Sequence, residues 1–187
     1  MHIERNGRPN FSEILARQYQ GSKPLDVAVV YPCDGVSLRG AVLAARGGAI
    51  RPLLIGPEER INELAGVGGL DIEDIDIHDV EYDFEAAEVA ARMARSGEVA
   101  AIMKGSLHTD VLMRAIVSRE AGLRTSQRMS HVFAVDHPGY HTLLLVTDAA
   151  INMTPTLREK RDIVQNAIDL AHRLGIALPK VALLAAV

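Results

Sequence analysis

The sequence has no tryptophan and a single cysteine, and aromatic residues make up only 4% of its 187 residues. The single cysteine, Cys33, excludes an internal disulfide framework and a cysteine-based metal cluster, which is typical of a reducing compartment. We expect this side chain to be buried as a small hydrophobe. No apolar run approaches the length of a membrane span, and residues 1–5 lack the apolar core of a signal peptide. The sequence therefore predicts a cytoplasmic protein without a membrane partner.

Basic charge is also scarce, and the formal net charge at pH 7 is -4. This balance gives no general attraction to nucleic acid or to an anionic membrane, so a phosphate site would have to be local. Arginine supplies most of the 20 basic residues. The only lysines are Lys23, Lys104, Lys160 and Lys180. Lys104 differs from the others because it ends an apolar run.

Hydrophobic residues make up 48% of the chain and charged residues 24%, which predicts one soluble domain with a real core. Short β-branched runs alternate with amphipathic stretches, a pattern typical of alternating strands and helices. The expected strands are Asp26 to Tyr31, Arg51 to Ile55, an exposed or edge strand in Asp71 to Val80, Val99 to Met103, Val132 to Val135, Thr142 to Val146 and a last buried strand, Val181 to Val187. The expected helices are Ser37 to Arg46, Pro57 to Leu64, Asp83 to Ser96, Thr109 to about Glu120 and Leu157 to Leu174.

This alternation predicts an α/β fold, a layered αβα sandwich with a mostly parallel sheet. The turn-forming segment Asp136 to Tyr140 lies between two apolar runs, so it predicts one antiparallel hairpin in addition. On the helix Asp83 to Ser96, the apolar spacing places Phe84 and Val89 on the buried face.

The segment Gly97 to Thr109 is the most informative, because its apolar strand stops at Lys104-Gly105-Ser106 and a helical pattern follows. This arrangement can present backbone amides, a hydroxyl and an ammonium to one anion at the carboxyl end of a strand. The glycine and the serine suit a close approach of the backbone to a ligand. The alternative is that Lys104 only extends from a strand end into water. The spacing matches neither the Walker loop nor the dinucleotide fingerprint.

Six short blocks in the second half of the sequence resemble a known family. They are Lys104 to Thr109, Leu112 to Ala115, Gly122 to Thr125, Ser130 to Val132, Thr147 to Met153 and Gln165 to Ala167. In order and spacing they resemble the phosphate acetyltransferase and phosphate butyryltransferase family. The Lys-Gly and Ser-His-Val sequences are similar to the butyryltransferase-like branch, which includes forms fused behind an enoyl-CoA hydratase-like domain. No such hydratase-like domain is present among these residues.

The resemblance implies reversible transfer of an acetyl or short-chain acyl group, so that acyl phosphate and coenzyme A give acyl-CoA and phosphate. It implies no metal, no tightly bound cofactor and no covalent acyl-enzyme, with coenzyme A as a co-substrate. The CoA thiolate would attack the acyl phosphate carbonyl in a ternary complex, while the enzyme supplies positioning, anion neutralisation and a base. The resemblance also implies the isocitrate/isopropylmalate dehydrogenase-like fold and a homodimer.

The first group of candidate site residues surrounds the Lys104 turn. The resemblance places Arg114 at the phosphate, where its donor fork suits an anion, whereas helix geometry alone equally allows a surface arginine. Ser106 and Thr109 are candidate hydroxyl donors to the same anion, or else helix caps. With Gly105 and Lys104 they form one predicted wall of a substrate site.

The second group lies in two later blocks. Ser130 and His131 follow a loop, where the histidine suggests a general base, although a histidine that hydrogen-bonds a strand end is more common. Thr147, Asp148 and Asn152 follow a strand and are expected to line the cleft. Asp148 would equally fix a turn through its own hydrogen bonds.

Members of the family continue beyond Leu184 into a segment that completes the second lobe and carries a Ser-Arg pair and an aspartate proposed as base. We therefore expect residues 1–187 to be a phosphate acyltransferase-like domain that lacks the carboxyl-terminal part of the family fold, with the base beyond Val187. Two other functions stay open. One is a non-catalytic protein that binds CoA or phosphate, and the other is a dehydrogenase-like relative with a nicotinamide cofactor and a metal. Against the latter, the sequence has no glycine fingerprint and no paired-aspartate metal constellation.

Overall fold

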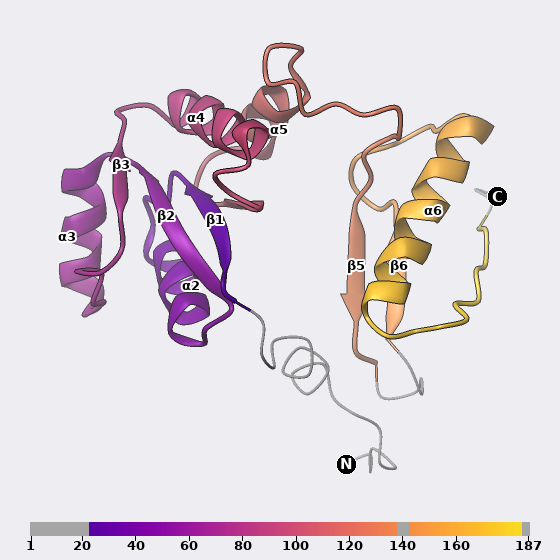
Figure 1. The fold of residues 1–187 in the computed structure, drawn as a ribbon, viewed down its shortest axis with the longest axis horizontal. Helices are drawn as coiled ribbons and strands as arrows, with labels where there is room; N and C mark the ends of the chain where they lie inside the picture. The colour runs from indigo at the N-terminus through magenta and orange to yellow at the C-terminus, as the bar shows by residue number, and fades with distance from the viewer. Residues whose placement is uncertain (1–22, 138–142, 185–187) are drawn as a thin grey trace, which may run out of the picture. The chain divides into compact units, whose positions relative to one another are not determined.

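The computed structural model describes residues 23–137 and 143–184 (Figure 1). The chain divides into two compact units, one formed by Gly21–Arg124 and one that includes Thr125–Val187. We call them the first and the second unit. Length and composition do not resolve this division, because they carry no information on where along the chain the contacts are few.

A parallel sheet forms the centre of the first unit. Its strands are β1 (Leu25–Val30), β2 (Ile50–Gly56), β3 (Ile77–Asp79) and β4 (Ala101–Lys104). They lie in the order β3-β2-β1-β4, and all neighbouring pairs are parallel. In this register Val30 lies opposite both Ile55 and Lys104. The parallel sheet that the sequence predicts is therefore confirmed.

The edge position expected for the segment Asp71 to Val80 is confirmed, but its strand is much shorter than predicted. The Glu73 amide donates to the Asp71 carboxylate at 3.2 Å, and the Ile75 amide donates to the Ile72 carbonyl at 3.0 Å. These local bonds form turns that use backbone groups a strand would need for pairing. Only the last part of the segment therefore joins the sheet.

Helices α2 (Gly35–Arg46) and α3 (Glu58–Gly68) lie on one face of the sheet, and α4 (Asp83–Ser96) covers the other face, with α5 (Thr109–Val117) packed against α4 (Figure 1). Alternate residues of β1 face opposite layers, so that Val27 and Val29 pack with α2 and α3, while Ala28 and Val30 pack with α4 and α5. The first unit is thus the layered αβα arrangement that the sequence predicts.

Helix α4 has the predicted bounds and ends at Gly97, which adopts a left-handed conformation with a φ of 81°. Its buried face is lined by Val89 and a set of alanines. Phe84 is not part of this face, contrary to the prediction, because it lies in the first turn, is 51% exposed and stacks on Tyr82. The small alanine side chains let the helix approach the sheet closely, and the bulky ring stays outside.

The described part of the second unit consists of an antiparallel strand pair and a helix. These are β5 (Val132–Val135), β6 (Leu144–Thr147) and α6 (Leu157–Arg173). Phe133 lies opposite Val146, which confirms the predicted pairing, although residues 138–142 of the connection and of the expected strand lie outside the described residues. Helix α6 begins with a capping box, in which Thr156 and Glu159 satisfy each other's backbone amides.

The prediction of a last buried strand is wrong for the residues that the structure describes. Residues 181–184 have no regular secondary structure, and Leu184 is 90% exposed, while residues 185–187 lie outside the described ranges. Apolar composition favours a strand only where a neighbouring strand is available for pairing, and nothing pairs with this segment in the described part of the unit. Within the same ranges, no helix is both long and apolar enough to cross a bilayer.

Candidate active site

The Lys104 turn lies at the topological switch point of the parallel sheet. The chain adds β2 and β3 on one side of β1 and then returns to place β4 on the other side. Such a reversal separates the following loops and opens a crevice at the carboxyl ends of the strands, where open α/β sheets bind their ligands. Lys104 ends β4 beside Val30, which ends β1. The predicted turn therefore occupies the position where a ligand is expected.

Gly105 is buried against the backbone of β1. Its amide donates to the Val30 carbonyl at 2.8 Å, and a Cβ added to it would lie 2.4 Å from that oxygen and 2.5 Å from the Tyr31 carbonyl oxygen. The sequence predicts a close approach of this glycine to a ligand. In the structure the close approach is to the neighbouring strand end, and only glycine fits there.

Ser106 connects the same two strand ends. Its amide and its hydroxyl both donate to the Tyr31 carbonyl at 2.9 Å, and its Oγ accepts from the Cys33 amide at 3.2 Å. Tyr31 has a φ of 53°, a left-handed conformation that is uncommon for a residue with a Cβ. These bonds hold the strained turn after β1 in place, so the Ser106 hydroxyl already has a structural role.

Lys104 extends from the edge with a lightly engaged ammonium group. Its Nζ donates to the Gly105 carbonyl at 3.1 Å, and it forms no ion pair with the described residues. The hydrogen bond from the Ser37 amide keeps the pKa of Asp34 below its ordinary value despite burial, and the charge of Lys104 makes the smallest contribution in the same direction. Asp34 also accepts from Val36 and so caps α2, which leaves no room for a ligand anion at that helix end.

The amino end of α5 is open, in contrast to that of α2. No side chain caps it, and the Thr109 hydroxyl has no hydrogen bond within the described residues. Arg114 reaches back toward this end to pair with Asp110 at 3.7 Å, with both side chains more than 70% exposed. A pair this exposed contributes little, so the guanidinium is available to a stronger partner. The α5 amino end thus presents free amides and a hydroxyl, with Arg114 beside it and Lys104 at the strand end that precedes it.

Two further residues complete the carboxyl edge of the sheet. Cys33 is 4% exposed and burial raises the pKa of its thiol, which confirms the predicted role as a small hydrophobe. Arg60, from the first turn of α3, donates to the Cys33 carbonyl at 3.3 Å. Sequence reasoning missed Arg60. The signal that points to it is a cation in the first turn of a helix, where the dipole disfavours positive charge.

In the second unit, Asp148 organises the loop after β6. Its carboxylate accepts the amides of His131, Ala150, Ile151 and Asn152 at 3.1 to 3.4 Å. Burial raises the pKa of this carboxyl, but the hydrogen bonds to the Asn152 side chain and to the amides outweigh it, and the net pKa is lowered. The geometry is that of the turn-fixing alternative, since the carboxylate accepts three amides of its own loop in addition to the His131 amide.

Asn152 joins this loop to the segment before β5. Its side-chain amide donates to Asp148 and, at 2.9 Å, to the Met129 carbonyl, and its Oδ1 accepts from Arg128 at 2.7 Å. Asn152 is 9% exposed and fully bonded. Thr147 also bonds inward, since its hydroxyl donates to the His131 carbonyl at 2.8 Å.

Ser130 is held by α6, because the Asn166 side chain donates to the Ser130 hydroxyl and to the Arg128 carbonyl, both at 2.8 Å. The ring of His131 packs edge-on against Phe133 with centroids 4.2 Å apart. Its Nδ1 is buried and has no hydrogen-bond partner in the described part of the chain. No hydrogen bond from residues 23–137 or 143–184 orients this ring through Nδ1 for proton transfer, and the general-base role stays a prediction.

The predicted site residues thus fall into two sets, one in each unit. Lys104, Gly105, Ser106, Thr109 and Arg114 lie at or near the carboxyl edge of the first unit. The set in the second unit comprises Ser130, His131, Thr147, Asp148 and Asn152. Each set is joined by hydrogen bonds or by a shared turn within its own unit.

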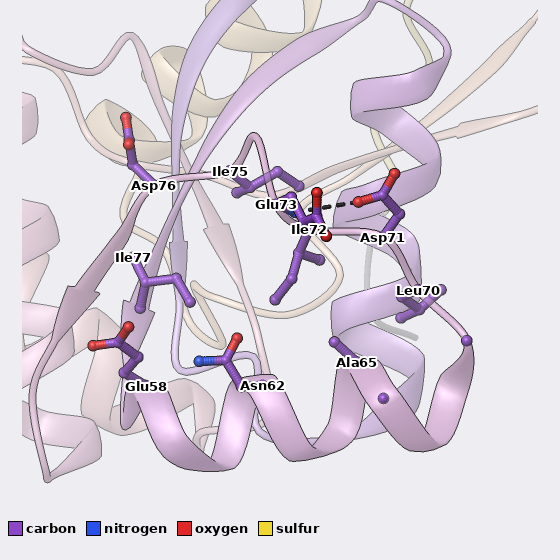
Figure 2. A pocket seen from close by; sticks show the side chains of 12 residues that line it. Glu58, Asn62, Ala65, Leu70, Asp71, Ile72, Glu73, Ile75, Asp76 and Ile77 are labelled. Atoms are coloured by element: carbon purple, nitrogen blue, oxygen red, sulfur yellow. Dashed lines mark hydrogen bonds between the residues drawn. The ribbon is translucent and has the colours of Figure 1, made fainter.

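A hollow of about 690 Å³ lies elsewhere in the first unit, between α3 and the segment before β3 (Figure 2). None of the predicted site residues lines it. Acidic side chains are frequent in its wall, which is formed by Glu58, Asn62, Ala65, Gly66, Gly69, Leu70, Asp71, Ile72, Glu73, Ile75, Asp76 and Ile77. This charge does not suit a phosphate ligand. No group of three His, Cys, Asp or Glu side chains in the described ranges is placed to hold a metal.

Known proteins resemble this chain both in fold and in sequence. A solved phosphotransacetylase from Streptococcus pyogenes superposes with a TM-score of 0.75 at 17% identity, over 90% of this chain and 60% of that one. Phosphate acetyltransferase of Rickettsia felis is 51% identical over 88% of this chain and 47% of its own length. A probable phosphate butyryltransferase of Bacillus subtilis is 38% identical over 86% of this chain and 53% of its own.

The chain spans about half the length of these relatives. The family described as "Phosphate acetyl/butaryl transferase" matches residues 59–187, which include every predicted site residue. The likeness to the solved structure concerns the fold, while the sequence match covers most of the chain. This chain therefore belongs to the phosphate acetyl/butyryl transferase family.

Proposed function

We propose that this chain takes part in the reversible transfer of a short acyl group between phosphate and coenzyme A. In the forward direction the CoA sulfur bonds to the carbonyl carbon of the acyl phosphate, the bond from that carbon to the phosphate oxygen breaks, and phosphate leaves with the electron pair. The thiol proton passes to a base. The observation that carries the proposal is the open amino end of α5 at the switch point, in a chain of this family.

The first unit supplies the site for the phosphoryl group. The first amides of α5 and the Thr109 hydroxyl donate to its oxygens, and Lys104 and Arg114 balance its charge. Phosphate leaves as an anion, and cations placed around it stabilise the charge that develops on it during the transfer. Gly105 and Ser106 act indirectly, because they hold the turn that carries Lys104 against β1.

The second unit supplies an ordered loop rather than free ligands. Asp148 and Asn152 hold the loop after β6 with their side chains, and Asn166 holds Ser130. Such a loop can contact a co-substrate through its outer surface and its exposed backbone. Its geometry is already fixed before the co-substrate binds. We propose that this surface contributes to the site for coenzyme A.

The proposal is tested by measuring thioester formation and CoA binding on the same preparation of the protein. Purified chain is mixed with acetyl phosphate or butyryl phosphate and CoA, thioester formation is followed by absorbance, and CoA binding is measured by calorimetry. Turnover supports the proposal and ranks the two acyl groups. CoA binding without turnover favours the second candidate, a non-catalytic protein that binds CoA or phosphate. If the chain shows neither turnover nor CoA binding, both the acyl transfer function and the non-catalytic binding function are contradicted.

Three predictions from the sequence accompany the proposal. A homodimer is expected from the family resemblance, and light scattering on the purified chain tests it. The cytoplasmic location and the likeness to the isocitrate/isopropylmalate dehydrogenase-like fold also stay predictions. Coenzyme A is proposed as a co-substrate that binds and leaves in each cycle, without a tightly held cofactor.

A further inference from the structure

We propose that Arg60 is a third cation of the phosphate site, in addition to Lys104 and Arg114, and that it binds a phosphate group of the ligand directly. The inference rests on the proposed function, since it concerns the same site. It adds a residue from a different helix, outside the sequence blocks that carry the family resemblance.

The hydrogen bonds place Arg60 and Lys104 at the same two strand ends. Arg60 donates to the Cys33 carbonyl at 3.3 Å, and the Cys33 amide donates to the Ser106 hydroxyl at 3.2 Å. Lys104 donates to the carbonyl of Gly105, the residue before Ser106, at 3.1 Å. Main-chain groups of residues 33 and 105–106, together with the Ser106 hydroxyl, thus connect the two side chains across the ends of β1 and β4. A phosphate at this edge lies within reach of both long side chains.

Arg60 and Lys104 both have capacity for a ligand. Each is exposed and spends one donor on a main-chain carbonyl, and neither forms an ion pair with a residue of the described ranges. A guanidinium has five N–H donors in a planar fork, which matches two oxygens of a phosphate. Arg60 therefore keeps most of its donors for an anion.

Local charge explains why a further cation is needed. The hydrogen bond from the Ser37 amide, and with it that from Val36, lowers the pKa of the Asp34 carboxyl despite burial, and the Lys104 charge makes a smaller contribution. Carboxylates occupy two of the helix amino ends at the carboxyl edge of the sheet, because Asp34 caps α2 and Asp79 accepts the Glu58 amide of α3 at 2.9 Å, whereas the α5 end is open. A dianion that approaches the end of β1 therefore meets carboxylates at two helix ends, and Arg60 is the cation placed to offset them.

The position of Arg60 has a cost in the free protein. It lies in the first turn of α3, where the helix dipole disfavours a positive charge, and Glu58 and Glu59 of the same turn are the residues that suit this end. An anion that binds beside Arg60 would offset this unfavourable interaction with the helix dipole. The ligand class is a phosphate dianion, which inorganic phosphate, an acyl phosphate and the phosphates of CoA all provide.

The experiment measures binding by titration calorimetry at low and moderate salt. The probes are inorganic phosphate, acetyl phosphate, CoA and 3′-dephospho-CoA, each against the full chain and its Arg60→Gln, Arg60→Lys and Arg46→Gln variants. Arg46 is the matched control, because it is an exposed arginine in the last turn of α2, at the opposite edge of the sheet.

Loss of one charge-assisted bond is expected to weaken binding about 10- to 100-fold in Arg60→Gln, with a partial effect in Arg60→Lys and none in Arg46→Gln. Weaker binding of phosphate and acetyl phosphate assigns Arg60 to the phosphoryl group. Weaker binding of CoA alone assigns it to the co-substrate, and the 3′-phosphate is its partner if dephospho-CoA is unaffected.

Unchanged affinities for all four probes in a folded Arg60→Gln variant overturn the assignment and leave the proposed function intact. Failure of the unsubstituted chain to bind any probe overturns both. Equal losses in Arg60→Gln and Arg46→Gln also overturn it, because they show a general charge effect. Thermal unfolding of each variant confirms that the comparison is made between folded proteins.

Discussion

The Gly105 amide donates to the Val30 carbonyl oxygen at 2.8 Å, and a side chain at position 105 would lie 2.4 Å from that same oxygen. Cβ atoms do not approach other atoms this closely without a shift of the backbone. The end of β4 therefore depends on glycine to reach the end of β1. Because Lys104 precedes this contact, the position of its ammonium depends on the contact too.

Replacement Gly105→Ala is expected to destabilise the first unit by about 1 to 3 kcal/mol, the usual range for an overpacked site. The methyl group would push β4 away from β1 and break the bonds that Ser106 makes with Tyr31. Hydrogen-deuterium exchange of peptides from β1 and β4 measures the local change in free energy, without assuming that both units unfold together.

The matched control for this substitution is Gly66→Ala in α3, where an added Cβ meets nothing within 4 Å. Alanine in a helix interior is expected to stabilise by about 0.5 to 1 kcal/mol, because it restricts the unfolded chain more than glycine does. A loss of stability in Gly105→Ala together with a gain in Gly66→Ala supports the close contact between Gly105 and the end of β1. A Gly105→Ala protein with unchanged exchange contradicts it.

Local pattern was sufficient to predict most of the fold. Helix α4 has its predicted bounds because Gly97 stops it and its apolar spacing is regular. The pattern failed where pairing decides the outcome. The segment before β3 forms turns through Asp71, and the apolar residues 181–184 have no strand beside them in the described part of the chain. Strand propensity reports side-chain preference and not the presence of a neighbour.

The position of the Lys104 turn in the fold could be predicted from the sequence, whereas the ligand roles of the candidate site residues stay predictions. Lys104 lies at the expected edge of the sheet, and the Thr109 hydroxyl has no hydrogen bond to the part of the chain that the structure describes. The Ser106 hydroxyl donates to the Tyr31 carbonyl, which is distant in the sequence, and the Asp148 carboxylate accepts amides of its own loop. The spacing of residues in the sequence does not reveal either set of hydrogen bonds. Arg60 was missed because it comes from a helix that the motif blocks do not include.

Asn166 on α6 links the segment before β5 to the helix, so Asn166→Ala is expected to destabilise the second unit by about 1 to 2 kcal/mol. The variant leaves the Arg128 carbonyl and the Ser130 hydroxyl without their donor. Gln165→Ala is the control, because among the described residues the exposed Gln165 side chain bonds to Asp169 of the same helix and not to the segment before β5. Faster exchange in β5 peptides of the first variant only is the expected result, and equal effects in both would count against the link.

Stability of the second unit is expected to depend on the ionisation of Asp148. Its pKa in the folded chain is lowered, so the bonds to the charged form contribute fully above the unfolded pKa of about 3.9 and are lost as the pH falls through the lower folded value. Asp148→Asn should be less stable by about 1 kcal/mol near pH 6, because one oxygen that accepts from Asn152 becomes a donor. The difference should shrink below pH 4 in urea titrations followed by circular dichroism. A constant difference between pH 6 and pH 3 contradicts the carboxylate network.

Lys104→Gln is expected to weaken the binding of phosphate and acetyl phosphate about tenfold, since the ammonium is free of ion pairs in the described ranges and its charge acts at the switch point. Gln keeps most of the side-chain length and removes the charge. The loss should be largest at low salt, because screening weakens the interaction of exposed charges. Lys160→Gln is the control, as Lys160 is an exposed lysine of α6 in the other unit. If both variants bind phosphate as the unsubstituted chain does, Lys104 only extends into water, and the anion site lies with other residues.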